Sequence, residues 1–190
     1  MQLNKFKVYY FVSEFNLTDL SQLSRNINII YRNYKNTKNL ETVYKLKRYC
    51  KKNGHKLYIS NNFKLSIKLG LNGVYIPSFN KRINFVQNYC LPKNFKIIGS
   101  AHNIIEINLK IKQRCTEIFI SPTFRVNKSK GFLGVVKYNY LTLDRKINFI
   151  ALGGICEKNF KLIKLLNSKG IASISWVKKN GLSKLRPFII

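Results

Sequence analysis

Short, unbroken apolar runs recur along the chain and are separated by longer stretches of mixed polarity. The runs are mostly rich in β-branched or aromatic residues, which is typical of strands buried on both faces. We therefore predict eight strands, at Val8–Ser13, Ile29–Arg32, Lys56–Ser60, Gly73–Pro77, Lys96–Ala101, Glu117–Pro122, Asn148–Ile155 and Ile171–Trp176.

Most of the intervening stretches carry apolar residues at helical spacing. For the first of them, Asn16 and Thr18 compete as the N-cap; we favour Thr18, because Asp19 then opens the first turn, where a negative charge is stabilising. The predicted helices are Asp19–Arg25, Leu40–Lys52, Phe63–Leu69, Ile104–Arg114 and Lys158–Asn167.

Eight strands that alternate with helices imply parallel βαβ units. An open doubly wound sheet and a closed barrel both fit, and the count of eight favours the barrel. The predicted fold class is α/β, a compact (β/α)8 TIM barrel, in a single domain over residues 1–190. Because such barrels usually have about 250 residues, we expect trimmed helices or loops.

The charge balance is strongly basic, with 35 Lys and Arg against 7 Asp and Glu and a net charge of +28. Such an excess suggests nucleic acid, anionic membranes or phosphorylated ligands as partners. The alternative is compositional drift, because the abundant Lys, Asn, Ile, Tyr and Phe all have AT-rich codons. The basic residues are spread over the whole chain, so we favour drift and keep nucleic acid as a less favoured partner.

Neither the cysteines nor the start of the chain indicates a metal site or a membrane. Cys50, Cys90, Cys115 and Cys156 stand alone, without metal-binding spacing, and we expect buried free thiols in a reducing compartment. The run Val8–Val12 is too short for a signal-peptide core or a membrane span. We therefore expect a cytoplasmic protein with no membrane contact and leave its oligomeric state open.

The glycine pair Gly153-Gly154 follows the seventh predicted strand. Active sites of (β/α)8 barrels lie at the C-terminal strand ends, and the loops after strands seven and eight usually bind phosphate. Paired glycines let backbone N–H groups approach an anion, and a helix starting near Cys156 would point its N-terminus at that anion. The alternative is a tight strand–helix turn without a ligand.

His102 follows the fifth strand, where a general acid or base would lie, although an N-cap or a satisfied polar contact explains it equally well. His55 precedes the third strand at the opposite end and is interpreted as structural. Carboxylates are scarce: only Glu14 directly follows a strand, and Glu157 lies just beyond the glycines. A carboxylate-held Mg²⁺ therefore has little support.

Several segments, in chain order from about Val8 to Trp176, resemble motifs of the thiamine phosphate synthase/TenI family. The two fairly specific similarities are Ala151–Ile155 with Asn159, close to A-I-G-G-I-x-x-x-N, and Gly170–Ser175, similar to G-v-A-v-v-S. Individually weaker similarities are Val8–Glu14 to Y-x-V-T-D, Tyr31-Arg32 to Q-x-R-x-K, Leu57–Leu65 to the N-D-R segment, Gly73–Ile76 to G-V-H-L, Ile98–His102 to I-G-x-S-x-H with one residue missing, and Ser121–Phe124 to G-P-x-F.

The resemblance implies a barrel of thiamine biosynthesis that binds a phosphorylated thiazole or pyrimidine precursor. In the family, the synthase joins a pyrimidine diphosphate to a thiazole phosphate with loss of pyrophosphate, and two aspartates hold Mg²⁺. TenI members isomerise a thiazole phosphate without that metal. We expect a synthase-like transferase or a TenI-like isomerase, with Mg²⁺ as a cofactor only if synthase activity is retained.

The chain departs from the family pattern where the metal would bind. The two metal aspartates fall on Asn61 and Asn80, so we expect no metal-ligating residue at these positions. The glutamine of Q-x-R-x-K is Ile30 and its lysine position is Tyr34, with Lys35 displaced by one. These losses support the alternative of a non-enzymatic ligand-binding barrel, whereas a nucleic-acid-associated protein is supported by charge alone.

The resemblance also implies roles for individual residues. The phosphate would be held by Gly153, Gly154, Ile174 and Ser175, mainly through backbone N–H groups. A second anionic group would meet Arg32, Ser100 and the loop lysine, Lys128 or Lys130. Ser60 and Asn61 would line the substrate site, and the catalytic candidates are His102, for proton transfer, and Arg32.

Overall fold

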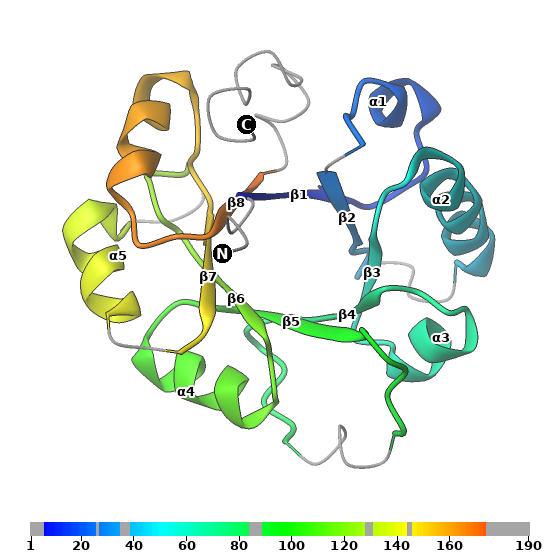
Figure 1. The fold of residues 1–190 in the computed structure, drawn as a ribbon. Coiled ribbons are helices and arrows are strands. Elements are labelled where there is room, and N and C mark those ends of the chain that lie inside the picture. The colour runs from blue at the N-terminus through cyan, green and yellow to red at the C-terminus, as the bar shows by residue number, and fades with distance from the viewer. Residues whose placement is uncertain are drawn as a thin grey trace, which may run out of the picture.

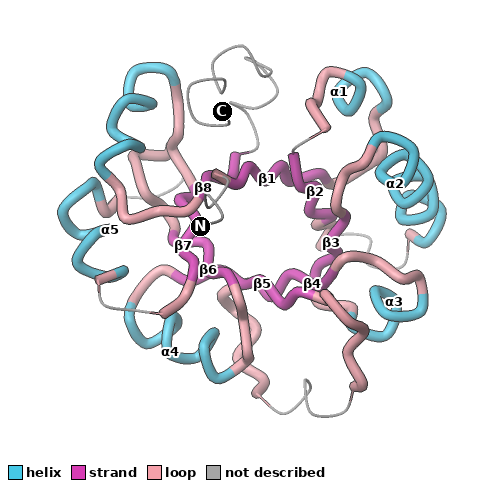
Figure 2. The backbone as a smooth tube through the Cα atoms, in the orientation of Figure 1, coloured by secondary structure: helices cyan, strands magenta, loops and turns pink. Residues whose placement is uncertain are grey.

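The computed structural model describes residues 6–25, 27–34, 39–83, 89–127, 131–143 and 146–173. Within them, eight parallel strands close into a barrel in sequence order, from β1 to β8. Helices surround the ring of strands (Figures 1 and 2). Because β1 pairs with both β2 and β8, the sheet has no open edge, which confirms the predicted closed TIM barrel over the open sheet.

Each strand overlaps one of the eight predicted apolar runs. Lys96–Ala101 is predicted to the residue, and the other strands differ from their runs at one or both ends. The strands are β1 (Lys7–Val12), β2 (Ile27–Tyr31), β3 (Leu57–Ser60), β4 (Gly73–Ile76), β5 (Lys96–Ala101), β6 (Glu117–Ile120), β7 (Asn148–Leu152) and β8 (Gly170–Ser173).

The helices require three corrections. The N-cap of the first helix is Asn16 and not Thr18, because the Asn16 side chain accepts a hydrogen bond from the Asp19 backbone N–H. The last predicted helix is a 3-10 helix, and α5 was not predicted. The helices are α1 (Leu17–Ser21), α2 (Leu40–Asn53), α3 (Phe63–Lys68), α4 (Ile104–Lys112), α5 (Gly134–Thr142) and the 3-10 helix η2 (Glu157–Leu165).

The barrel is shortened in its connections. Helix α1 has only five residues, and α3 has six. Residues 77–83 and 89–95, the described parts of the connection between β4 and β5, contain no helix. Trimmed connecting segments, as expected from the length of the chain, therefore let 190 residues accommodate a closed eight-strand barrel.

The centre of the barrel is packed with aromatic side chains. Tyr9 meets Phe119 edge to face at a ring-centroid distance of 4.9 Å, and Phe11 meets Tyr75 at 5.3 Å. Tyr58 completes this group, and all five side chains are buried. The interior is thus a solid core, and ligands are confined to the two ends of the barrel.

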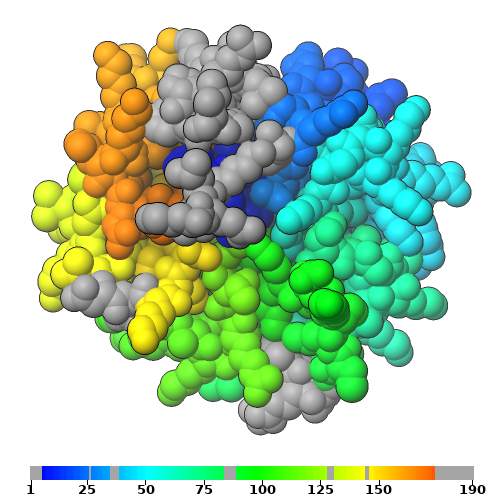
Figure 3. Space-filling model, viewed as in Figure 1, coloured from blue at the N-terminus to red at the C-terminus, as the bar shows by residue number. Residues whose placement is uncertain are grey.

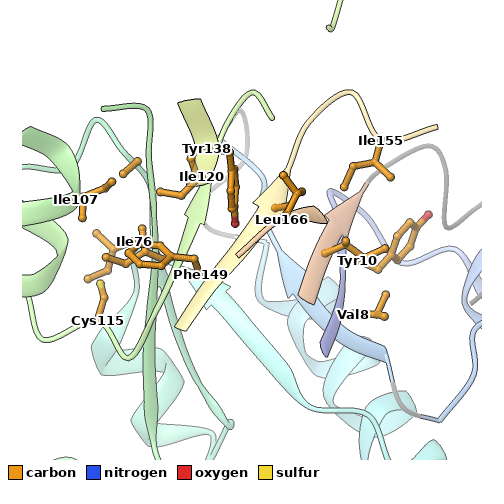
Figure 4. Close-up of a cluster of buried hydrophobic side chains, with 14 of the residues drawn as sticks. Val8, Tyr10, Ile76, Ile107, Cys115, Ile120, Tyr138, Phe149, Ile155 and Leu166 are labelled. Atoms are coloured by element: carbon orange, nitrogen blue, oxygen red, sulfur yellow. The ribbon is translucent and has the colours of Figure 1, made fainter. Parts of the chain in front are cut away.

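A second apolar layer lies between the outer face of the strands and the helices. Ile107 of α4 and Tyr138 of α5 are fully buried in it, together with strand residues such as Ile120. Figure 4 shows members of this layer, from Ile107 and Cys115 to Val8 and Tyr10. The space-filling view shows successive segments of the chain following one another around the molecule (Figure 3).

Glu117, the first residue of β6, carries a buried carboxylate at the N-terminal end of the barrel. One of its oxygens accepts from Lys7 at 2.7 Å and Lys96 at 3.0 Å, and the other accepts from the Tyr9 hydroxyl. Burial alone would raise the pKa of Glu117, but these hydrogen bonds and the two lysine charges outweigh it and lower that pKa. The carboxylate therefore stays ionised and ties three strands together.

The four free cysteines differ in burial. Cys50 and Cys115 are buried free thiols, as expected, whereas Cys90 and Cys156 are exposed, which corrects the expectation for those two. Both lie outside the strands and helices, so no apolar layer covers them. Among the described residues, no helix combines the length and apolar character needed to cross a membrane.

Candidate functional site

The C-terminal ends of the strands form one rim of the barrel. Arg32 follows β2, Asn61 follows β3, His102 follows β5 and Gly153 follows β7. Because all strands are parallel, these residues lie at the same end of the barrel, as the sequence predicts. The other site residues on described strands are Ser60 and Ser100, whereas Lys128, Ile174 and Ser175, with Lys35 and Lys130, lie outside the described residues.

Arg32 lies above the aromatic core. Its backbone N–H donates to the Val12 carbonyl at 2.8 Å, which continues the β1–β2 ladder by one bond. The guanidinium carbon lies 4.6 Å from the centroid of Phe11 and 5.7 Å from that of Tyr34. In the part of the chain that is described, no carboxylate forms an ion pair with Arg32. Its polar neighbours are the neutral hydroxyls of Tyr34 and Tyr75, so its positive charge can attract an anion at the rim.

Two serine hydroxyls lie just below the rim. Ser100 is buried and accepts a 2.8 Å hydrogen bond from the Tyr75 hydroxyl. Burial raises the pKa of Tyr75 to about 12, so this hydroxyl stays protonated and Ser100 keeps its own proton to donate. The Ser60 hydroxyl oxygen is buried and has no hydrogen-bond partner among the described residues. Buried hydroxyls rarely remain unpaired, which makes Ser60 a candidate ligand contact.

A cavity of about 160 Å³ lies beside Ser60, on the β2–β3 side of the rim. Tyr34, Asn61 and Asn62 also line it. The rings of Tyr34 and Phe79 meet edge to face at 5.4 Å, and both are substantially exposed. An exposed aromatic pair beside amide groups is a surface on which a flat heteroaromatic ring can stack.

Asn61 and Asn80 are hydrogen-bonded to one another at this rim. Asn80 Oδ1 accepts from the Arg82 backbone N–H at 3.1 Å, so its Nδ2 faces Asn61 and donates to Asn61 Oδ1 at 2.9 Å. Asn61 adopts a left-handed backbone conformation with φ of +58°, which asparagine tolerates better than most residues. The positions that the resemblance assigns to the metal aspartates are therefore in direct contact, as two neutral amides.

This donor set does not fit a Mg²⁺ ion. Mg²⁺ is usually anchored by one or two carboxylates together with substrate phosphates. Here Asn80 Oδ1 already accepts a backbone hydrogen bond, and Asn61 Oδ1 accepts from Asn80. The neighbouring Lys81 and Arg82 share an open hollow with this pair and repel a dication. Within the described ranges, no group of three or more His, Cys, Asp or Glu residues is placed to hold a metal.

The loop that carries Ser78 and Asn80 is held by α4. The fully buried Lys110 Nζ donates to the carbonyl oxygens of Pro77 at 2.7 Å and Asn80 at 3.0 Å. Gln113 Nε2 donates to the carbonyls of Asn80 and Arg82. Sequence reasoning missed this support, although a lysine three residues after the buried Ile107, on the apolar face of the predicted helix, was a signal for it.

His102 connects three loops of the rim. Its Nδ1 lies 2.6 Å from the Ser121 carbonyl oxygen, and its Nε2 lies 3.1 Å from the Ser78 hydroxyl. A carbonyl only accepts, so Nδ1 carries the proton and Nε2 accepts from Ser78. The backbone N–H of His102 donates to the Glu106 carboxylate. The N-cap of α4 is Asn103, whose side chain accepts from the Glu106 backbone N–H, so the N-cap interpretation of His102 is wrong. The ring contacts fit the two remaining interpretations, a satisfied polar contact and a proton-transfer group.

Gly153 and Gly154 both adopt left-handed backbone conformations, with φ of +90° and +70°. A Cβ on Gly154 would lie 2.3 Å from the Phe124 carbonyl oxygen, and one on Gly153 would lie 3.2 Å from Pro122 Cα. Asn159 secures the turn, because its Nδ2 donates to the Gly154 carbonyl at 2.8 Å. Packing against Phe124 thus explains why residue 154 is glycine, without any ligand. Phosphate binding at this turn stays a prediction.

The comparisons with known proteins agree with the resemblance. A family model described as thiamine monophosphate synthase matches residues 22–177. Two thiamine-phosphate synthases of Prochlorococcus marinus are similar: 27% identical over 139 residues in strain AS9601, and 30% identical over 141 residues in subspecies pastoris. These matches cover 72% and 73% of this chain but 39% of each relative, so the chain spans about two fifths of their length.

Solved structures show the same fold. Thiamine phosphate pyrophosphorylase from Pyrococcus furiosus superposes with a TM-score of 0.78 at 17% identity, over 98% of this chain and 96% of that one. The corresponding enzyme from Bacteroides thetaiotaomicron gives a TM-score of 0.60 at 15% identity, over 96% and 93%. Since the family model matches most of the chain, the chain belongs to the thiamine monophosphate synthase family.

Proposed function

We propose that the chain binds and converts a phosphorylated precursor of thiamine at the C-terminal rim, and that it does so without a carboxylate-held Mg²⁺. Family membership supports the class of small phosphorylated substrate. The observation that carries the metal-independent part is the 2.9 Å hydrogen bond from Asn80 to Asn61, which joins the two positions of the metal aspartates.

The rim offers cations where the family would use a metal. Arg32 lies over the core without a carboxylate partner among the described residues, and Lys81 and Arg82 line the hollow next to Asn61. Positive groups at the rim stabilise negative charge that develops on a departing diphosphate. Lys128 and the phosphate-binding set Gly153, Gly154, Ile174 and Ser175 complete the proposal.

His102 is the proposed proton carrier. With Nδ1 held on the Ser121 carbonyl, Nε2 is the basic atom and is in contact with Ser78. In this tautomer Nε2 carries the lone pair that can take up a proton from a substrate. That chemistry suits the isomerisation of a thiazole phosphate, in which a proton is moved from one carbon to another.

The test is a coupled assay for thiamine phosphate with purified full chain, run with EDTA and with millimolar Mg²⁺. We expect equal turnover in both conditions and a loss of turnover in Arg32→Gln. Turnover that needs Mg²⁺ would contradict the proposal. Lys51→Gln, an exposed lysine on α2 far from the rim, is the matched control and keeps its turnover.

The second candidate function is a barrel that binds a thiazole phosphate without converting it. The same amide pair favours it, because the carboxylates that would hold Mg²⁺ against a diphosphate are missing. Isothermal titration with thiazole phosphate separates the two candidates. Saturable binding without turnover or isomerisation supports the binding protein, and binding with metal-independent conversion supports the enzyme.

A further inference from the structure

We propose a second anion-binding site at the opposite, N-terminal end of the barrel, which takes a small phosphate-bearing anion. We call it the floor cavity: a cavity of about 250 Å³ lined by four basic side chains and two buried tyrosines, namely Lys7, Arg25, Lys56, Lys96, Tyr9 and Tyr58. Nothing in the thiamine chemistry proposed for the rim uses these residues.

The strands bring these cations together from distant parts of the chain. Lys7 opens β1, Lys96 opens β5, and Lys56 immediately precedes β3. Since the strands are parallel, their first residues meet at one end of the barrel. Arg25 joins them from the turn that precedes β2. The convergence of the three lysines is therefore set by the barrel, and Arg25 adds a fourth cation from a turn.

The charge of the floor cavity is unbalanced. Its four cations face one carboxylate, Glu117, which leaves a net charge of 4 − 1 = +3. Glu117 is already engaged by Lys7, Lys96 and Tyr9. In the described part of the chain, no carboxylate forms an ion pair with Arg25 or Lys56. An anion in the cavity would relieve this repulsion.

Glu117 also holds two of the donors in place. The side chains of Lys7 and Lys96 are only 28% and 35% exposed, and both ammonium groups lie within 3.0 Å of the same carboxylate oxygen. Each ammonium has three N–H donors. Donors with fixed positions lose less conformational entropy on binding than mobile surface lysines. This distinguishes the floor cavity from the many lysines that are merely solvated.

Size and position define the ligand. A volume of about 250 Å³ lies below the usual range for small-molecule pockets, about 300–1,000 Å³, and suits phosphate, pyrophosphate or a small phosphate ester. The six residues of β1 separate the two ends of the barrel by roughly 20 Å at about 3.3 Å per residue. A small ligand at the rim cannot reach the floor cavity, so the two sites take separate ligand molecules.

The test is an amide NMR titration of the full chain with inorganic phosphate, pyrophosphate and glycerol phosphate at constant ionic strength. We expect saturable shifts at Gly54 and Lys56, with affinity reduced about tenfold or more in Arg25→Gln and in Lys56→Gln, as for loss of a charged hydrogen bond. Lys52→Gln removes an exposed charge from α2 outside the cavity, and it should leave the affinity unchanged.

Arg32→Gln separates this proposal from the proposed function. It should abolish rim binding and leave the shifts at Gly54 and Lys56 intact. Non-saturating shifts, or equal effects of Lys56→Gln and Lys52→Gln, would overturn the floor cavity whatever happens at the rim. Binding of glycerol phosphate as tight as that of phosphate identifies a phosphate ester as the ligand class, and binding of only the inorganic ions identifies free phosphate or pyrophosphate.

Discussion

At the scale of single residues, Asn61 and Asn80 satisfy each other's hydrogen bonding at the rim, without a metal ion between them. Each amide offers both a donor and an acceptor, so the two side chains join directly at 2.9 Å. Two carboxylates at these positions would have acceptors only and would repel unless a cation lay between them. With asparagine at both positions, the two side chains are therefore stable in direct contact without a metal, whereas two aspartates would need a cation between them.

The double variant Asn61→Asp with Asn80→Asp tests this account. Without Mg²⁺ we expect a loss of stability of about 1–3 kcal/mol, from charge repulsion and the lost amide hydrogen bond. Millimolar Mg²⁺ should reverse it, because the cation then bridges the two carboxylates. Thermal denaturation of the double and both single variants forms a double-mutant cycle. Additive effects with no response to Mg²⁺ would contradict the account.

A second prediction at the residue scale concerns the pH dependence of folding stability, to which Glu117 contributes. Its pKa in the folded state is lowered, so its stabilising contribution is present above the ordinary carboxyl value of about 4.3 and is lost as the pH falls below it. Urea denaturation between pH 7 and pH 3 should show this loss in the wild-type chain and much less of it in Glu117→Gln. Glu14→Gln, an exposed carboxylate, is the control and should follow the wild type.

At the scale of elements, α4 does more than cover the sheet. Lys110 and Gln113 lie on its buried side and hold three carbonyl groups of the segment after β4. The same segment provides Ser78 for His102 and Asn80 for Asn61. The helix therefore positions the rim through its side chains, and its Glu106 carboxylate also accepts from the His102 backbone N–H at the rim.

Lys110→Met should destabilise the fold by about 2–3 kcal/mol, because two backbone carbonyls and the Gln113 side chain lose a charged donor in a buried place. Hydrogen exchange should accelerate at residues 78–82 in particular. Lys112→Met, on the exposed face of the same helix, is the matched control and should change neither quantity. Unchanged exchange at 78–82 in Lys110→Met would show that the loop is held by other contacts.

The elements also show how far the sequence alone could lead. All eight strands follow from apolar runs, because strands buried on both faces leave an unmistakable pattern. Helix α5 was missed because its β-branched and aromatic residues obscure the helical period, and it buries only Tyr138 and Thr142. The partners of Asn61, His102 and Lys110 come from other loops, and such contacts depend on the closed barrel. Local periodicity carries no information about them.

At the scale of the whole molecule, the net charge of +28 affects the stability of the fold even when no partner is bound. The described residues contain few ion pairs, namely those of Lys7 and Lys96 with Glu117 and that of Lys45 with Glu41. Most positive charges therefore face one another through solvent. Their mutual repulsion favours the expanded, unfolded chain.

Salt should consequently stabilise the protein. The Debye length falls from about 30 Å at 0.01 M to about 10 Å at 0.1 M salt, so the melting temperature should rise between 20 and 300 mM NaCl. Scanning calorimetry in NaCl, with sucrose at matched water activity as the control, measures this effect. A melting temperature that falls with salt would mean that favourable charge pairs dominate.

The same charge bears on nucleic acid as a partner. Retention of the protein on DNA at 300 mM salt would support nucleic-acid binding.

The pairing of β1 with β8 has a consequence for synthesis on the ribosome. Lys7 lies opposite Gly170, so β1 leaves the exit tunnel well before β8 and must wait for β8 before its second edge is covered. At roughly 5–20 residues per second, that delay is about 8–30 s. During this time β1 exposes an unpaired apolar edge. Nascent chains that lack β8 should therefore be clients of chaperones, and the emergence of β8 should end that dependence.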